Sequence, residues 1–104
     1  MAMIEYTGQP INDLLSQDEV VLVQYYAEWC NPCQMLKPIL EELSGEITNV
    51  KFYRVNIEEY RDLAVNAGVQ SIPTVVVFKN GEEVGRERGF KPKPQMEAWI
   101  KKFA

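Results

Sequence analysis

The chain has 104 residues, of which 46% are hydrophobic and 25% charged, and its formal net charge is −4. That size predicts a single domain covering residues 1–104, and the composition is ordinary for a globular protein. The acidic balance, without a basic cluster, argues against nucleic acid and anionic membranes as partners.

The first half of the chain is predicted to form two strands and two helices. Met3–Thr7 has the pattern of a short strand, and its Glu5, with no long apolar run around it, argues against a signal peptide or membrane span and for a cytoplasmic location. A helix of about 8 residues begins near Ile11. The hydrophobic run Val20–Ala27 begins with the continuous apolar segment Val20–Val23, which predicts a central strand buried on both faces, and Cys33–Leu43 has an apolar stripe at helical spacing.

The second half is predicted to contain three more strands and two more helices. Their order is strand Val50–Ile57, helix Glu58–Ala67, strand Thr74–Phe78, strand Glu82–Arg88 and helix Pro94–Phe103. Asn80-Gly81 between the last two strands is a strong signal for a type I′ hairpin turn. Strands that alternate with helices predict an α/β domain in which helices cover both faces of a mixed sheet.

The chain's two cysteines lie in Trp29-Cys30-Asn31-Pro32-Cys33, between the central strand and the helix that follows it. Two thiols three positions apart on the first turn of a helix are close enough to form a disulfide. The partial positive charge of a helix N-terminus favours thiolate, so the pKa of Cys30 should lie below the free value of ~8.5. This geometry predicts thiol–disulfide exchange, with Cys30 as the nucleophile and Cys33 as the buried resolving thiol.

A metal site is the main alternative for these cysteines. The sequence has no histidine and no third cysteine, so one chain cannot supply a tetrahedral Cys/His site. A zinc or iron–sulfur centre shared by two chains, with one cysteine pair from each, would satisfy the ligand count. We expect no metal in the single chain.

The sequence resembles the thioredoxin family along essentially its whole length. The likeness is carried by Ala27-Glu28-Trp29-Cys30-x-Pro32-Cys33, Ser71-Ile72-Pro73-Thr74, Phe78-Lys79-Asn80-Gly81 and Gly89. It implies a thioredoxin fold, with a mixed sheet of about five strands and about four helices, and a protein-disulfide reductase without a bound cofactor. The implied partners are disulfide-containing target proteins and a flavin- or ferredoxin-linked thioredoxin reductase, and the implied state is a monomer.

The resemblance also assigns roles to residues far from the cysteines. Pro73 should follow a cis peptide bond and pack against the cysteine pair. An apolar docking surface for extended substrates should surround the nucleophile, formed by Trp29, Ile57, Val69, Ile72, Pro73, Gly89 and Phe90. Taken alone, Ile57 or Val69 would be interpreted as a core residue, and Phe90 departs from the smaller residues common in the family.

Three positions at the site need separate interpretation. Gln24 replaces a buried Asp of most family members; it can orient a thiol or a water but cannot act as a general base, and a neutral amide also costs less to bury. Asn31 replaces the usual Gly and either tolerates an unusual φ or donates its amide to the Cys30 sulfur. Arg54 takes the place of a common Lys and, without an Asp partner, is predicted to extend toward solvent.

The missing Asp leaves a different class of function open. The domain would then be a binding or scaffold subunit whose thiol chemistry is incidental. Replacing Cys30 with serine separates the two hypotheses, because a scaffold tolerates that change and a reductase does not.

Overall fold

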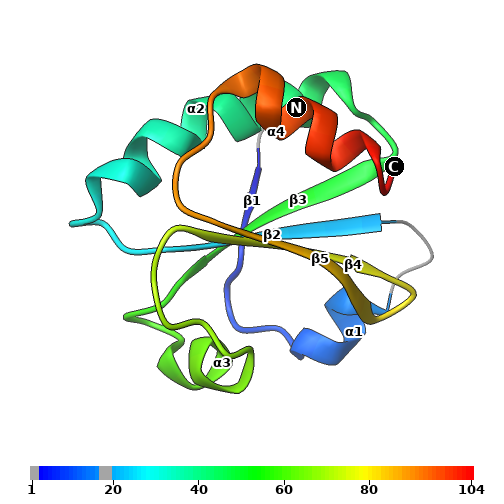
Figure 1. The fold of residues 1–104 in the computed structure, drawn as a ribbon. Helices are drawn as coiled ribbons and strands as arrows, with labels where there is room; N and C mark the ends of the chain where they lie inside the picture. The colour runs from blue at the N-terminus through cyan, green and yellow to red at the C-terminus, as the bar shows by residue number, and fades with distance from the viewer. Residues whose placement is uncertain (1–2, 17–19) are drawn as a thin grey trace.

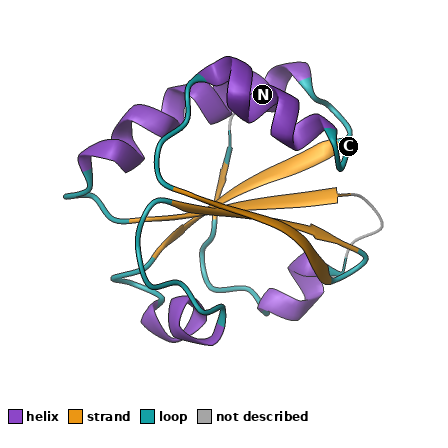
Figure 2. Ribbon diagram, viewed as in Figure 1, coloured by secondary structure: helices purple, strands orange, loops and turns teal. Residues whose placement is uncertain are grey.

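The computed structural model describes residues 3–16 and 20–104. Its elements, in chain order, are β1 (Ile4–Glu5), α1 (Ile11–Leu15), β2 (Val20–Tyr26), α2 (Asn31–Glu46), β3 (Val50–Asn56), α3 (Arg61–Asn66), β4 (Thr74–Lys79), β5 (Glu82–Arg88) and α4 (Lys93–Lys101). The strands form one sheet, with α2 and α4 on one face and α1 and α3 on the other (Figures 1 and 2). Among the described residues, no helix is both long and apolar enough to cross a membrane.

Strand β2 is the centre of the sheet, whose order is β1-β3-β2-β4-β5. It pairs in parallel with β3 and antiparallel with β4, and all seven of its residues are buried. Alternate side chains of a strand point to opposite faces, so β2 contributes to two cores. Val20 and Leu22 pack with α2 and α4, whereas Val21 and Val23 belong to the core on the α1 side.

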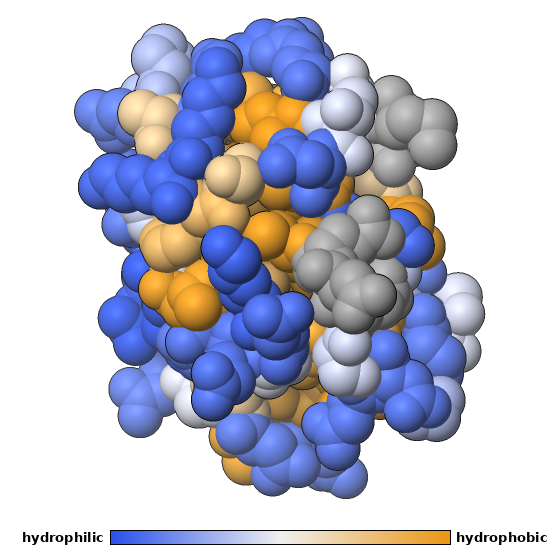
Figure 3. All heavy atoms as spheres, turned by 90° about the vertical axis from the view of Figure 1, so that its right-hand side faces the viewer, coloured by the Kyte–Doolittle hydropathy of each residue, from blue (hydrophilic) through white to orange (hydrophobic). Residues whose placement is uncertain are grey.

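The predicted α/β sheet with helices on both faces is confirmed, and β5 has the predicted bounds. The turn between β4 and β5 places Asn80 at φ 55° and Gly81 at φ 84°, the positive values that a type I′ hairpin requires. This hairpin lies at the end of the sheet away from the start of α2 and faces the viewer in Figure 3, where hydrophilic side chains cover most of the surface.

The prediction placed several element ends differently from the structure. The first strand is Ile4–Glu5, and α1 has 5 residues in place of about 8. Helix α3 starts at Arg61 instead of Glu58, because the Asn56 side-chain oxygen accepts hydrogen bonds from the backbone amides of residues 58 and 59 and holds a turn there. Such local side-chain bonds compete with helix formation.

A close approach at Gly85 packs the C-terminal residues onto β5. A Cβ atom added at this position would lie 2.5 Å from the ring of Phe103, which in turn makes an edge-to-face contact with Trp99. We therefore expect Gly85→Ala to lower the free energy of unfolding by about 1–3 kcal/mol, the usual cost of overpacking. Urea unfolding would measure this loss, and the loss should shrink in a Phe103→Ala background; an equal loss in both backgrounds would contradict the steric explanation.

Candidate active site

The two cysteines form a disulfide at the N-terminus of α2, with their Cα atoms 5.2 Å apart. Cys30 is the N-cap residue, in an extended conformation, and its sulfur accepts a hydrogen bond of 3.2 Å from the Cys33 backbone amide. Pro32 occupies one of the first two helical positions, where a residue without an N–H costs nothing. The helix therefore starts at Asn31, earlier than predicted, and its unpaired amide end points at the sulfur of Cys30.

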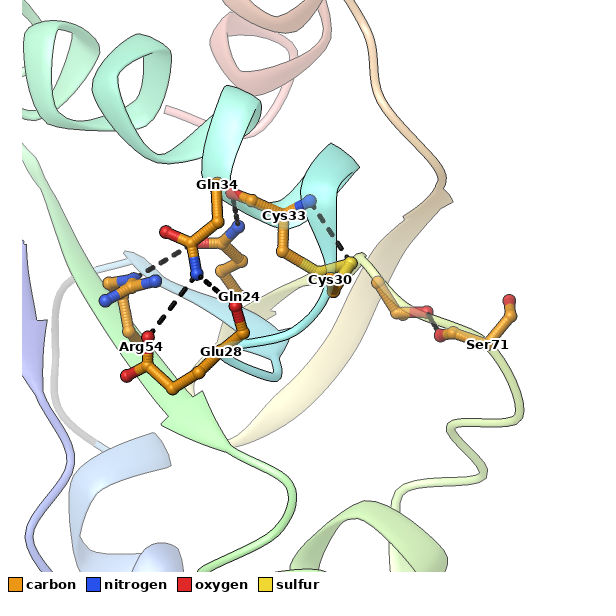
Figure 4. Close-up of a disulfide and its surroundings, with 8 residues drawn as sticks. Gln24, Glu28, Cys30, Cys33, Gln34, Arg54 and Ser71 are labelled. Atoms are coloured by element: carbon orange, nitrogen blue, oxygen red, sulfur yellow. Dashed lines mark hydrogen bonds between the residues drawn. A yellow bond between two sulfur atoms is a disulfide. The ribbon is translucent and has the colours of Figure 1, made fainter.

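The cysteine pair is largely enclosed. Cys30 is 5% exposed and Cys33 is fully buried, so Cys30 is the more accessible of the two. Tyr26 and Ala27, at the end of β2 and just after it, belong to the same buried cluster as the two sulfurs. The loop before Cys30 is tied to α2, since Gln34 donates its amide to a backbone oxygen of this loop (Figure 4).

The interpretation that Asn31 tolerates an unusual φ is wrong. Asn31 lies inside α2, and the one non-glycine residue with positive φ in the described part of the chain is Asn80. Its side chain is exposed, and the hydrogen bond to the Cys30 sulfur comes instead from the Cys33 backbone. The ordinary helical conformation at this position needs no glycine.

The Ile72–Pro73 peptide bond is cis, as the resemblance implied. Pro73 is buried, and its backbone oxygen accepts a hydrogen bond of 2.8 Å from the Gly89 amide. Thr74, the first residue of β4, donates its hydroxyl to the Ser71 backbone oxygen at 2.6 Å. These bonds hold the loop that precedes β4 beside the cysteine cluster, against which Ile72 packs.

A groove of about 350 Å³ opens next to the disulfide. It is lined by Trp29, Ile57, Val69, Gln70, Ser71 and Ile72. Trp29 is 65% exposed, which is unusual for so large an apolar side chain. Four of the seven predicted docking residues line this groove, whereas Pro73, Gly89 and Phe90 lie outside its lining. Gln70 and Ser71 were not predicted, although their place in the loop before Pro73 was a usable signal.

Gln24 lies beneath the disulfide and is fully buried (Figure 4). Its amide nitrogen donates to the Cys33 backbone oxygen at 3.3 Å, so in this disulfide-bonded state it contacts Cys33 through the carbonyl. Its oxygen accepts from Arg54 Nε, also at 3.3 Å. The prediction that Arg54 extends toward solvent is wrong: it is 6% exposed and its guanidinium lies 3.6 Å from the centre of the Tyr26 ring.

Glu5 supplies the carboxylate that Arg54 was predicted to lack. Its side chain is 3.4 Å from Arg54 Nη1 and also accepts a hydrogen bond from the Tyr26 hydroxyl at 2.5 Å. Burial and then this hydrogen bond raise the pKa of Tyr26 well above its usual range. The sequence prediction missed both Glu5 and Tyr26 as site residues, since the link between them depends on how β1 aligns with β3.

No cluster of three or more His, Cys, Asp or Glu side chains within the described ranges could hold a metal ion. The arrangement provides a dithiol–disulfide pair at a helix N-terminus, an apolar groove beside it and two buried polar side chains, Gln24 and Arg54, linked to it through the Cys33 backbone oxygen. Its chemistry is the reversible exchange of a disulfide with external thiols.

Comparison with known proteins agrees with this chemistry. The thioredoxin family model matches residues 3–102. The chain is 43% identical to the thioredoxin of Rickettsia bellii over 89 residues, 85% of each chain, and 39% identical to that of Bacillus subtilis over 103 residues, 98% of each. Among solved structures, a Plasmodium falciparum thioredoxin is similar with a TM-score of 0.91 at 32% identity, covering 98% of this chain and all of that one.

A mutant thioredoxin from Halobacterium salinarum is also similar, with a TM-score of 0.88 at 34% identity, over 98% of this chain and 90% of that one. The family model, the relatives and the solved structures all indicate a thioredoxin, which agrees with the Cys30–Cys33 disulfide at the start of α2. The chain belongs to the thioredoxin family of protein-disulfide oxidoreductases.

Proposed function

We propose that this protein reduces disulfides in other proteins, with Cys30 as nucleophile and Cys33 as resolving thiol. The Cys30 thiolate attacks one sulfur of the target disulfide, forms a mixed disulfide and releases the other target sulfur as a thiolate. Cys33 then attacks the Cys30 sulfur, forms the Cys30–Cys33 disulfide and releases the second target thiolate. Two electrons pass to the target.

The placement of the Cys30 sulfur carries this assignment. Cys30 is the more accessible sulfur, sits at the N-cap of α2 and accepts a backbone hydrogen bond, all of which favour a reactive thiolate there. The groove beside it presents the apolar side chains of Trp29, Ile57 and Ile72, a suitable surface for an unfolded or extended segment of a target.

We also propose how the dithiol is regenerated and where the protein acts. Members of this family generally act with thioredoxin reductase, so a flavin- or ferredoxin-linked reductase would return the Cys30–Cys33 disulfide to the dithiol. The protein would work as a monomer in the cytoplasm, where thiols are kept reduced, and as an electron donor to many target disulfides. The site residues present need no bound cofactor for this exchange.

A turnover assay tests the proposal. With excess dithiothreitol as reductant, the wild-type protein should accelerate reduction of a model protein disulfide at substoichiometric amounts, and Cys30→Ser should lose the acceleration entirely. Equal rates for the two proteins would contradict the proposal and favour a scaffold role. Zinc or iron in protein purified under reducing conditions, together with the mass of a dimer, would favour the shared metal site instead.

A further inference from the structure

A row of polar side chains crosses the sheet beneath the cysteines. Glu5, Arg54 and Gln24 are register partners on the adjacent strands β1, β3 and β2. Side chains in register on neighbouring strands point to the same face, and here that face is the one covered by α2, where Gln24 contacts Cys33. We call these three residues the polar row.

The row connects solvent to the redox site through three contacts. Glu5 Oε1 is 3.4 Å from Arg54 Nη1, Arg54 Nε donates to Gln24 Oε1 at 3.3 Å, and the Gln24 amide donates to the Cys33 backbone oxygen at 3.3 Å. The Arg54 side chain is 7% exposed and that of Glu5 is 44% exposed. Glu5 is therefore the member of the row that meets water.

Tyr26 holds the same guanidinium from another side. Its ring centre lies 3.6 Å from the Arg54 guanidinium carbon, and its hydroxyl donates to Glu5 Oε2. Because Tyr26 belongs to the buried cluster that contains Cys30 and Cys33, one aromatic ring links the guanidinium to the cysteine cluster. A carboxylate, an aromatic ring and an amide thus hold one buried cation beside Gln24, the residue that contacts the Cys33 backbone.

The position of this cation depends on Glu5. A buried guanidinium without its carboxylate is strongly unfavourable, and a long side chain escapes that cost by extending to water. Since Glu5 already lies at the solvent boundary, Arg54 has a short path outward once the carboxylate is removed. Gln24 would then lose its donor and the cysteines would lose the nearby positive charge.

We propose that Glu5 is a positioning residue for disulfide exchange: it holds the Arg54 guanidinium beneath Gln24, so that a fixed positive charge favours the thiolate form of the cysteine pair. The inference rests on the thiol–disulfide exchange proposed above. The inference also predicts the direction in which loss of Glu5 shifts the equilibrium between disulfide and dithiol. A carboxylate acting only through space would disfavour a thiolate, so its removal would help the dithiol form, whereas removal of a positioning carboxylate harms it.

Equilibration with glutathione at pH 7 measures the direction of this shift. The reaction is protein disulfide plus two glutathione thiols giving protein dithiol plus glutathione disulfide. For Glu5→Ala we expect the equilibrium to shift toward the protein disulfide by threefold or more, and alkylation of Cys30 by iodoacetamide to slow by a similar factor. Arg54→Met should give the same shift. The double variant, Glu5→Ala with Arg54→Met, should exceed either single variant by less than twofold.

Two further variants complete the test. Tyr26→Phe removes the hydroxyl that donates to Glu5 without changing the charge at pH 7, and it should shift the equilibrium in the same direction by a smaller factor. Glu97→Ala is the control for loss of a partly exposed carboxylate, because Glu97 is 34% exposed and pairs with Lys101, which is itself exposed. We expect no shift for Glu97→Ala. Urea midpoints verify that each variant is folded at the assay temperature.

The possible outcomes separate the role of Glu5 from the proposed function. A shift toward the dithiol in Glu5→Ala, no shift at all, or additive shifts in the double variant would overturn it. A wild-type protein that exchanges with glutathione but reduces no protein disulfide would contradict the proposed function and leave the role of Glu5 standing. The reverse pattern, with protein disulfides reduced normally and Glu5→Ala unchanged, contradicts only the role of Glu5.

Discussion

Replacing Cys33 with serine should turn the protein from a catalyst into a trap for its targets. Cys30 would still attack a target disulfide, but no neighbouring thiol would remain to release the target, and a serine hydroxyl is not ionised at neutral pH. We expect the mixed disulfide to persist at least about a hundredfold longer than in the wild-type protein, because its release would depend on slow attack by an external thiol. Non-reducing electrophoresis and mass spectrometry of captured proteins would measure this.

The matched control for the trap is Cys30→Ser. Cys33 is fully buried, so that variant should capture almost nothing even though it also retains one thiol. Equal recovery of disulfide-linked proteins by the two variants would contradict the assignment of Cys30 as the attacking sulfur. Preferential capture by Cys30→Ser would exchange the two roles.

Gln24→Asp should make the stability of the protein depend on pH. Position 24 is fully buried, and desolvation disfavours a carboxylate there, so the folded-state pKa of the new Asp should rise above its unfolded value of about 3.9. Arg54 does not cancel this effect, because the Asp side chain is one methylene shorter and the guanidinium is already held by Glu5 and Tyr26. A rise of about two units corresponds to about 2.7 kcal/mol.

The sign of the pH dependence follows from proton binding. Between the unfolded and the raised folded pKa, the folded variant binds more protons than the unfolded one, so its stability falls as pH increases through this interval. The loss levels off once the folded carboxyl has ionised. Gln24→Asn is the control, since it has the same shape without a charge. Urea midpoints of the two variants should diverge from pH 4 to pH 7; parallel midpoints would contradict the buried placement of the carboxylate.

Much of this fold is encoded in local patterns that a sequence displays directly. The hydrophobic run Val20–Ala27, the charged strand Glu82–Arg88 and the Asn80-Gly81 turn each have one favourable structure, so they were predicted closely. The short first strand and α1 were overestimated, because elements of two and five residues are defined by pairing and packing with the rest of the chain. The cysteine pair was equally visible, since its spacing alone brings the two sulfurs together.

The surroundings of the cysteines were harder to predict. Arg54 appeared to lack a partner because position 24 carries no carboxylate, whereas the actual partner lies on a strand 49 residues away in sequence. That pairing depends on the parallel register of β1 with β3, which no local pattern specifies. The groove was predicted only in part. Val69 and Ile72 were identified from the family likeness, whereas Gln70 between them is polar and has no sequence feature that indicates a groove.

The central position of β2 has a consequence for the dynamics of the redox site. Strand β2 is hydrogen-bonded on both sides and buried along its length, so its amide hydrogens should exchange with deuterium only when the whole domain unfolds. Strand β1, paired on one side over two residues, can open locally. Because the cysteines lie in the short connection after β2 and at the start of α2, the sulfurs are attached to the segment expected to exchange most slowly, and thiol–disulfide exchange there should not require opening of the supporting sheet.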